Sequence, residues 1–326
     1  MLIVASLGFK ITAVPFHFYA PDVYMATTNL NAGLLAVVPK IAGFLALFRL
    51  TTLLVPLFPD FAWQLMVILS ILTMTIGNVS ALLQKNVRRL MAYSSIAHAG
   101  YMLIGVAVGL FSDNEGLVYG GFAAAFLYLV VYGLASIGTF AALGEVEDDE
   151  TATGSVASLA GLAYRRPWMA GAIGICMFSL AGLPPLAGFW GKLTLFSSAL
   201  TAYRSDPAGS MFLVLAIVGV VNAAIAAAYY LRIVGAMYFD KAHSQDTSTV
   251  GVGAVAAVIC GVAVVVAGLF PGPMVDHFRR VGPAQFSARV AELSEVESGS
   301  GGDDVLAIVN PTIMAPTGPH ATTRLP

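Results

Sequence analysis

Charged residues are scarce in this sequence of 326 residues. Asp, Glu, Lys and Arg together make up 10% of it, whereas a soluble domain has about 25%. Hydrophobic residues make up 58%, and the formal net charge is −2. The basic residues form no stripe of the kind that binds nucleic acid. The composition therefore predicts a polytopic protein of the lipid bilayer and excludes a nucleic-acid partner.

Cysteine is almost absent as well. Cys176 and Cys260 both lie in apolar runs, and two such residues are too few for a disulfide framework, an iron–sulfur cluster or a zinc site. We therefore expect no metal and no cofactor in this chain, and any redox chemistry to occur elsewhere. A basic N-terminal region is also missing, and Lys10 interrupts the apolar opening, which argues against a signal peptide.

Long apolar runs, in contrast, are abundant. About 20 apolar residues span a bilayer as a helix, and on this basis we predict an all-α membrane bundle of about eight crossings over 1–272. A polar tail, 273–326, is expected to be largely disordered, with a short helix at about 286–297. The expected crossings are 2–19, 30–54, 62–84, 88–110, 116–143, 167–203, 210–238 and 250–271.

Two of these crossings should be broken. Pro184 and Pro185 interrupt the sixth crossing just before Lys192, and Pro15 follows Lys10 in the first. In hydrocarbon such breaks occur only where the backbone faces protein or a wet cavity. Five crossings separate the two, so they run in opposite directions, as in an inverted repeat built around discontinuous helices. Helices matching those before the sixth crossing do not precede the first, and we therefore expect the chain to begin part-way through a larger unit.

Basic residues in short loops indicate the orientation. One side of the predicted bundle has more of them and is assigned to the cytoplasm by the positive-inside rule. These residues are Lys85, Arg88, Arg89, Arg165, Arg166 and Lys241.

Three lysines fall inside predicted crossings: Lys10, Lys40 and Lys192. Each costs about 2.5–3.5 kcal/mol near a helix centre, and such residues usually face a bundle interior and mark an ion or proton path. The acidic residues all map to loops, crossing ends or the tail, and the acidic run from Glu145 to Glu150 is expected to form a solvated loop. Either the lysines titrate in a hydrated cavity or their counter-ions belong to another chain; the structural alternative is that they extend to the membrane interface.

His98 lies mid-crossing, one helical turn from Ser94 and Ser95. A histidine with hydroxyl neighbours can pass protons through its two ring nitrogens. It can equally form a satisfied hydrogen bond between helices. Both interpretations remain open from the sequence.

Four motifs resemble the N-subunit family of bacterial proton-translocating NADH-quinone oxidoreductase, respiratory complex I. The resemblance covers about residues 1–272. The motifs are Leu7-Gly-Phe-Lys-Ile-Thr-Ala-Val-Pro-Phe-His17, Ala20-Pro-Asp-Val-Tyr24, Asn86-Val-Arg-Arg-Leu-Met-Ala-Tyr-Ser-Ser-Ile-Ala-His-Ala-Gly-Tyr101 and Leu180-Ala-Gly-Leu-Pro-Pro-Leu-Ala-Gly-Phe-Trp-Gly-Lys192.

The resemblance implies an antiporter-like subunit of fourteen helices, of which this chain supplies the last eight. It implies a multi-pass protein of the inner (plasma) membrane that takes part in proton translocation, coupled to reduction of a quinone bound elsewhere in the complex. Lys10, Lys40, Lys192 and His98 would lie on the proton path. The partners would be other membrane subunits, and the chain itself would carry no flavin, cluster or nicotinamide. The family's glutamate that pairs the lysine at position 10 lies on a helix not found here.

Alternative functions stay open. One is a stand-alone cation/proton antiporter, although the crossings hold no acidic cation site. Another is a non-pumping, truncated assembly subunit. The family's usual acid and Pro-Thr-Pro turn after Tyr24 are replaced here by Met25-Ala-Thr-Thr-Asn-Leu-Asn31, and a split subunit or a mis-assigned start would also explain the missing helices.

Overall fold

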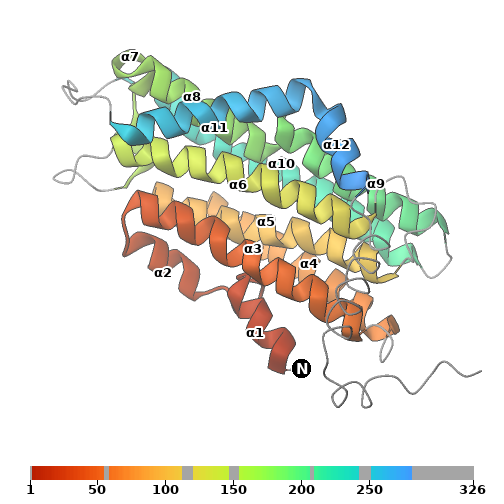
Figure 1. Cartoon of the computed structure of the whole chain (residues 1–326). Helices are drawn as coiled ribbons and strands as arrows, with labels where there is room; N and C mark the ends of the chain where they lie inside the picture. The colour runs from red at the N-terminus through yellow and green to blue at the C-terminus, as the bar shows by residue number, and fades with distance from the viewer. Residues whose placement is uncertain are drawn as a thin grey trace, which may run out of the picture. The chain divides into compact units, whose positions relative to one another are not determined.

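The structure is a computed structural model. It describes residues 2–54, 59–111, 120–146, 154–205, 209–241 and 251–280. Within these ranges the backbone forms helices and short turns, without a named strand (Figure 1). The helices are α1 (Leu2–Lys10), α2 (Tyr19–Met25), α3 (Asn29–Leu54), α4 (Pro59–Leu82), α5 (Val87–Phe111), α6 (Gly121–Val146), η1 (Val156–Leu159), α7 (Leu162–Arg165), α8 (Pro167–Ala181), α9 (Ala187–Ser205), α10 (Ser210–Phe239), α11 (Val252–Leu269) and α12 (Pro271–Arg280).

Six of these helices are long and apolar enough to cross a membrane: α3, α4, α5, α6, α10 and α11. The two remaining crossings are split into α1 with α2 and α8 with α9, which places both breaks where prolines were noted in the sequence. The all-α membrane bundle with two broken crossings is therefore confirmed. Pro39, by contrast, is accommodated inside the continuous helix α3.

The break in the second split crossing has a clear local cause. Gly182 ends α8 in the left-handed conformation, with φ of 87°, and its N–H donates to the carbonyls of Phe178 and Ser179. Pro184 and Pro185 then remove two backbone donors, so the helix cannot continue. The chain resumes helical structure at Ala187. In the first split crossing, α1 ends at Lys10, and the chain turns before α2.

Helices α5 and α6 form the buried centre of the bundle. In the apolar stretch of α5, 89% of the residues are buried, and in that of α6 78% are buried. The corresponding share in α11 is 28%. α6 packs against α3, α5, α8, α9 and α11. At the α5–α6 crossing, a Cβ added to Gly121 would collide with backbone atoms of Gly105 and Gly109. Small residues therefore let these two backbones approach closely.

One acidic residue departs from expectation. Glu145 was expected in a solvated acidic loop, but it lies in the last turn of α6 and accepts hydrogen bonds from the N–H groups of Gly251 and Gly253, at 3.0 and 2.8 Å. These groups open α11, where unpaired N–H groups and the helix dipole favour a carboxylate. The other acids of the run, 147–150, lie outside the described residues.

The described part of the chain falls in one compact unit, Met1–Gly282. The expected boundary between membrane domain and tail, after residue 272, lies inside α12. The rest of the predicted tail, with its possible helix at 286–297, lies outside the described residues.

We expect Gly121→Val to lower the free energy of unfolding by about 1–3 kcal/mol or more, because the added side chain has no room between α5 and α6. Thermal unfolding of the purified chain in detergent measures the effect. Gly235→Val in α10 is the matched control, since nothing lies within 4 Å of an added Cβ there. Equal losses in the two variants would contradict the close packing.

Candidate functional site

Lys40 occupies the middle of α3, and its side chain is 1% exposed. Its Nζ donates a hydrogen bond to Oγ of Ser95 on α5. The same Nζ lies 5.5 Å from the ring centroid of Tyr132 on α6, within the range of a cation–π contact. The buried ammonium group is thus held by neutral groups on two neighbouring helices.

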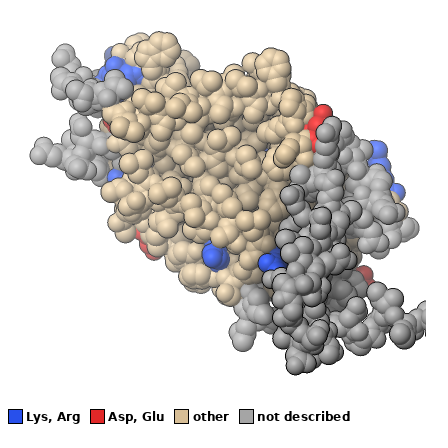
Figure 2. All heavy atoms as spheres, in the orientation of Figure 1, with Lys and Arg blue, Asp and Glu red and all other residues tan. Residues whose placement is uncertain are grey.

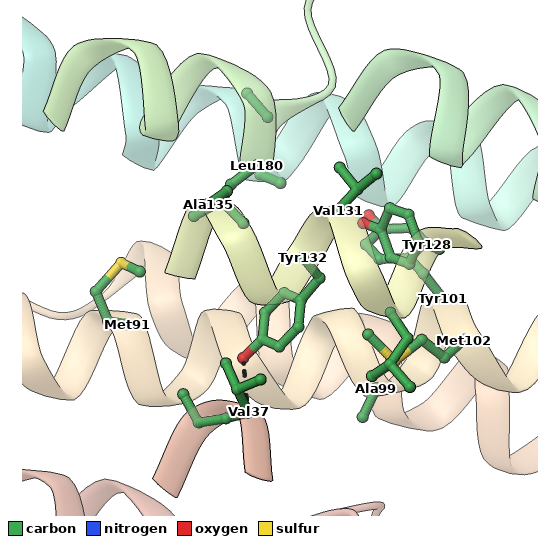
Figure 3. Packing of buried hydrophobic residues seen from close by; sticks show 14 of the residues in the cluster. Val37, Met91, Ala99, Tyr101, Met102, Tyr128, Val131, Tyr132, Ala135 and Leu180 are labelled. Carbon is green, nitrogen blue, oxygen red and sulfur yellow. Dashed lines mark hydrogen bonds between the residues drawn. The ribbon is translucent and has the colours of Figure 1, made fainter. Parts of the chain in front are cut away.

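Ser95 joins several hydroxyl groups at this point. It accepts a hydrogen bond from Tyr132 OH at 2.7 Å, and it lies 3.3 Å from Tyr24 OH, where either oxygen can donate. Tyr132 reaches from α6 toward α3, beside Val37 (Figure 3). Side chains of α2, α3 and α6 therefore meet α5 at one buried serine.

His98 lies one turn further along α5 and is 2% exposed. Its Nδ1 is 2.6 Å from Tyr128 OH on α6, and its Nε2 is 2.9 Å from Tyr230 OH on α10. Tyr230 OH also contacts Oγ of Ser94. Both ring nitrogens are therefore hydrogen-bonded, an arrangement that fits both interpretations of this residue left open by the sequence.

The ring of Tyr132 lies between the Lys40–Ser95 pair and His98. Its centroid lies 5.0 Å from that of His98, while its hydroxyl contacts Ser95, the partner of Lys40. The lysine of α3 and the histidine of α5 thus belong to one cluster.

Lys192 lies on α9, just after the break, and is 4% exposed. Its Nζ donates to the carbonyls of Leu180 and Ala181, at 2.9 and 2.8 Å. These carbonyls belong to the last turn of α8, where they lack helical partners and where the helix dipole favours a cation. Nζ also lies 5.0 Å from the ring centroid of Tyr101 on α5. The broken helix end itself therefore serves as the partner of the lysine.

Tyr101 leads into a second group of polar residues between α4 and α10. Asn78 donates to Tyr101 OH at 3.3 Å and to Oδ1 of Asn222 at 3.1 Å. Tyr229 OH donates to Oδ1 of Asn78 at 3.0 Å. Amide side chains in apolar helices usually bond across a helix interface, and these connect α4 with α10 beside the Lys192 site.

Lys10 lies apart from this cluster. It is the last residue of α1 and is exposed, because α1 packs chiefly against α3. An interior position for Lys10 is therefore not found within the described part of the chain. The ring of Tyr101 lies 5.9 Å from that of His98 and 5.0 Å from Nζ of Lys192, so the structure places Lys192 beside the cluster of Lys40 and His98, but not Lys10.

Sequence reasoning missed most of the cluster's hydroxyl and amide groups. Tyr128 and Tyr132 are spaced four residues apart and so share one face of α6, a signal that could have been noticed. Asn78 and Asn222 are isolated amides within apolar runs, which was a second signal. Which helices these side chains would join could not be read from spacing alone.

Comparison with known proteins places the chain in a family. Residues 1–206 match the family model described as NADH:quinone oxidoreductase/Mrp antiporter, transmembrane. The chain belongs to this family. The multi-pass location in the inner membrane that was expected fits both the family and the six apolar helices.

Among antiporter-family relatives, NADH-quinone oxidoreductase subunit N of Rhodospirillum rubrum is 38% identical over 275 residues, covering 84% of this chain and 53% of the relative. Subunit N 2 of Roseiflexus castenholzii is 39% identical over 291 residues, covering 86% and 55%. The resemblance to the N-subunit family is thus confirmed. The chain spans about half the length of these relatives.

Solved structures agree on the fold. A chain of respiratory complex I from Thermus thermophilus with bound aureothin is 34% identical, with a TM-score of 0.68, over 84% of this chain and 57% of that one. A chain of the Mrp complex from Dietzia sp. has a TM-score of 0.71 over 85% and 57%, at 22% identity. The second likeness concerns the fold alone.

We expect Gly182→Ala to lower the free energy of unfolding by about 1–3 kcal/mol. The left-handed conformation disfavours a side chain, and the new Cβ would lie 2.8 Å from Cδ of Lys192. Thermal unfolding in detergent measures the loss. Gly171→Ala in the same helix α8 is the control, because its added Cβ meets nothing within 4 Å; a loss as large there would show that helix α8 tolerates no alanine, whatever the position.

Proposed function

We propose that this chain takes part in proton translocation as a membrane subunit of an NADH-quinone oxidoreductase. Protons would move along the cluster that contains Lys40, His98 and Lys192, driven by quinone reduction elsewhere in the complex. The chain would contribute to this translocase without redox chemistry of its own. Its partners would be other membrane subunits and the surrounding lipid of the inner membrane.

One observation carries the proposal: two buried lysines and a buried histidine lie in one buried region of the membrane bundle. Ser95 and Tyr132 lie between Lys40 and His98, and the ring of Tyr101 lies next to both His98 and Lys192. An ammonium group away from water is costly, so a small change in the local field is enough to shift it between its charged and neutral forms. The contacts of both lysines are with carbonyls, a hydroxyl and aromatic rings, all of them neutral. Such groups stabilise the ammonium form without holding it permanently.

The residues between the lysines are suited to moving a proton. A hydroxyl group donates one hydrogen bond and accepts others, and a neutral imidazole donates at one nitrogen and accepts at the other. Tyr128, His98 and Tyr230 form a row in which each member can take a proton on one side and release one on the other. Tyr132, whose ring lies 5.0 Å from that of His98, and Ser95 lie between this row and Lys40.

Lys10 is proposed as a further member of the path. It is exposed in this chain, and the sequence pattern assigns the acidic residues to loops, crossing ends or the tail. An exposed lysine on a membrane helix is costly in lipid. A counter-ion for Lys10 would therefore come from a neighbouring polypeptide in the assembled complex.

The names of the relatives indicate the redox reaction to which proton movement in this chain would be coupled. Both sequence relatives are called NADH-quinone oxidoreductase subunits, and the structural neighbour at 34% identity belongs to respiratory complex I. The cluster described above gives this chain residues of the kind that such a role requires.

In the assembled oxidoreductase, we expect Lys192→Met and Lys40→Met each to reduce the protons moved per NADH oxidised by on the order of tenfold or more, because the proton-carrying group is lost. Inverted membrane vesicles with a pH-sensitive dye measure proton uptake, and NADH oxidation is followed in parallel. Lys85→Ala, in the turn between α4 and α5, is the control and should leave the ratio unchanged.

The outcomes separate the competing functions. Parent-like proton uptake in both methionine variants would favour a non-pumping assembly role. Exchange of sodium or potassium ions for protons by the chain alone in liposomes, without a redox partner, would favour a stand-alone antiporter. Complex assembly is checked in each variant by the amount of the membrane subunits that co-purify.

Tyr230→Phe keeps the aromatic ring but removes the hydroxyl between His98 and Ser94. We expect a clear fall in proton uptake at an unchanged amount of assembled complex, because one ring nitrogen of His98 loses its partner. Tyr164→Phe is the matched control, since the side chain of Tyr164 is 77% exposed. If the two variants pump equally well, Tyr230 serves packing rather than proton movement.

A further inference from the structure

The two cysteines of the chain, which lie in separate apolar runs of the sequence, meet at one point inside the bundle. A Cβ added to Gly138 on α6 would lie 2.8 Å from Sγ of Cys176 on α8 and 2.8 Å from Cβ of Cys260 on α11. These two cysteine atoms are therefore separated by no more than twice that distance. Each thiol also lies within electrostatic range of the other. The structure thus forms a pair of neighbouring thiols.

The packing of three helices brings the pair together. α6, α8 and α11 each contact the other two, and both cysteines lie near the middle of their helices. Gly138 has no side chain, so the backbone of α6 leaves room for Sγ of Cys176 and Cβ of Cys260. Both cysteines are free rather than joined in a disulfide. The fold therefore holds two unmodified thiols deep in the membrane bundle.

The two thiols differ in exposure. Cys176 is fully buried, whereas Cys260 is half-buried, and its neighbours Ile259 and Val262 on α11 are exposed. The visible surface in Figure 2 consists mostly of uncharged side chains, with charged ones mainly near its edges. An uncharged compound enters such a region of the membrane far more readily than a charged one. Cys260 is therefore the thiol that a compound dissolved in the lipid reaches first.

Two neighbouring thiols in hydrocarbon favour a ligand that joins both sulfurs and leaves no charge. Sulfur ligands select soft, thiophilic partners. A complex of two thiolates with a monovalent ion such as Cu(I) carries a net negative charge, which is costly away from water. An organic arsenical with trivalent arsenic, R–As=O, instead gives a neutral product in which arsenic is bonded to R and to both sulfurs.

This condensation needs no oxidant or reductant. The two As–S bonds form as the As=O bond breaks, and the hydrogens of the two thiols leave with the oxygen as one molecule of water. Rotation about the Cα–Cβ bond of Cys260 moves its sulfur between staggered positions while its Cβ stays in place. Once arsenic is bonded to Cys260, the second bond forms within the same molecule and is favoured by proximity.

We propose that Cys176 and Cys260 form a dithiol binding site for trivalent arsenicals where α6, α8 and α11 meet. The arsenical enters from the lipid, reacts with Cys260 and then with Cys176, and links α8 to α11. The site uses no residue of the proton path, so its test does not depend on the proposed function.

The test treats the full chain in lipid vesicles with phenylarsine oxide and follows the mass of the intact chain. We expect one adduct per chain. A dithiol such as 2,3-dimercaptopropanol should remove it at a concentration on the order of a hundredfold lower than a monothiol requires, because both As–S bonds must be replaced. Absence of the adduct, or equal removal by the two reagents, would overturn the proposal.

Cysteine variants identify the two sulfurs. Cys176→Ser and Cys260→Ser each leave one thiol, and each should lose the adduct that resists the monothiol. Cys176→Ala and Cys260→Ala repeat the test without a hydroxyl group in the apolar interior, and thermal unfolding verifies that each variant is folded. A resistant adduct in any of these single-thiol variants would show that arsenic is not held by this pair.

A displaced pair is the matched control. Cys260→Ser combined with Ile259→Cys keeps two thiols in the chain and changes their depth by one residue, but it places the second thiol at an exposed position of α11. This variant should behave as a single thiol, and a resistant adduct in it would contradict a site defined by the contact at Gly138. Failure of the parent to react in the assembled complex would contradict entry from the lipid.

Discussion

The contact between Lys192 and the open end of α8 is the interaction on which this architecture depends. A helix that stops inside a membrane leaves carbonyl groups without partners, and a lysine inside a membrane lacks water; each is costly alone. Here the ammonium group donates to Leu180 and Ala181, so each defect satisfies the other. The break and the charge are therefore one feature, and neither can be removed without exposing the other.

The arrangement of the helices keeps these polar side chains away from the lipid. α5 carries Ser94, Ser95, His98 and Tyr101 and is almost wholly enclosed. α3, α4, α10 and α11 present apolar side chains to the outside. The polar groups thus contact one another rather than lipid, and most of their hydrogen bonds join different helices.

Much of the fold could be predicted from the sequence. Run length located the crossings, and the missing donors of Pro184 and Pro185 located a break, because both signals are local. The buried positions of Lys40, Lys192 and His98 followed from their depth in apolar runs. The partners of these residues did not follow, because the hydroxyl contacts of Tyr132 and Tyr230 depend on how α6 and α10 rotate against α5. Glu145 read as loop because its role depends on α11, more than a hundred residues away.

The hydroxyl of Tyr230 has a single hydrogen but touches both His98 and Ser94. When this hydrogen points to the imidazole, the ring carries its own hydrogen on Nδ1 and donates to Tyr128; when it points to the serine, the ring tautomer is reversed. The row from Ser94 to Tyr128 is consequently bistable, and every member changes direction together. If the row carries protons as proposed, the passage of one proton leaves it polarised the opposite way, and it must be reset before it can carry another in the same direction.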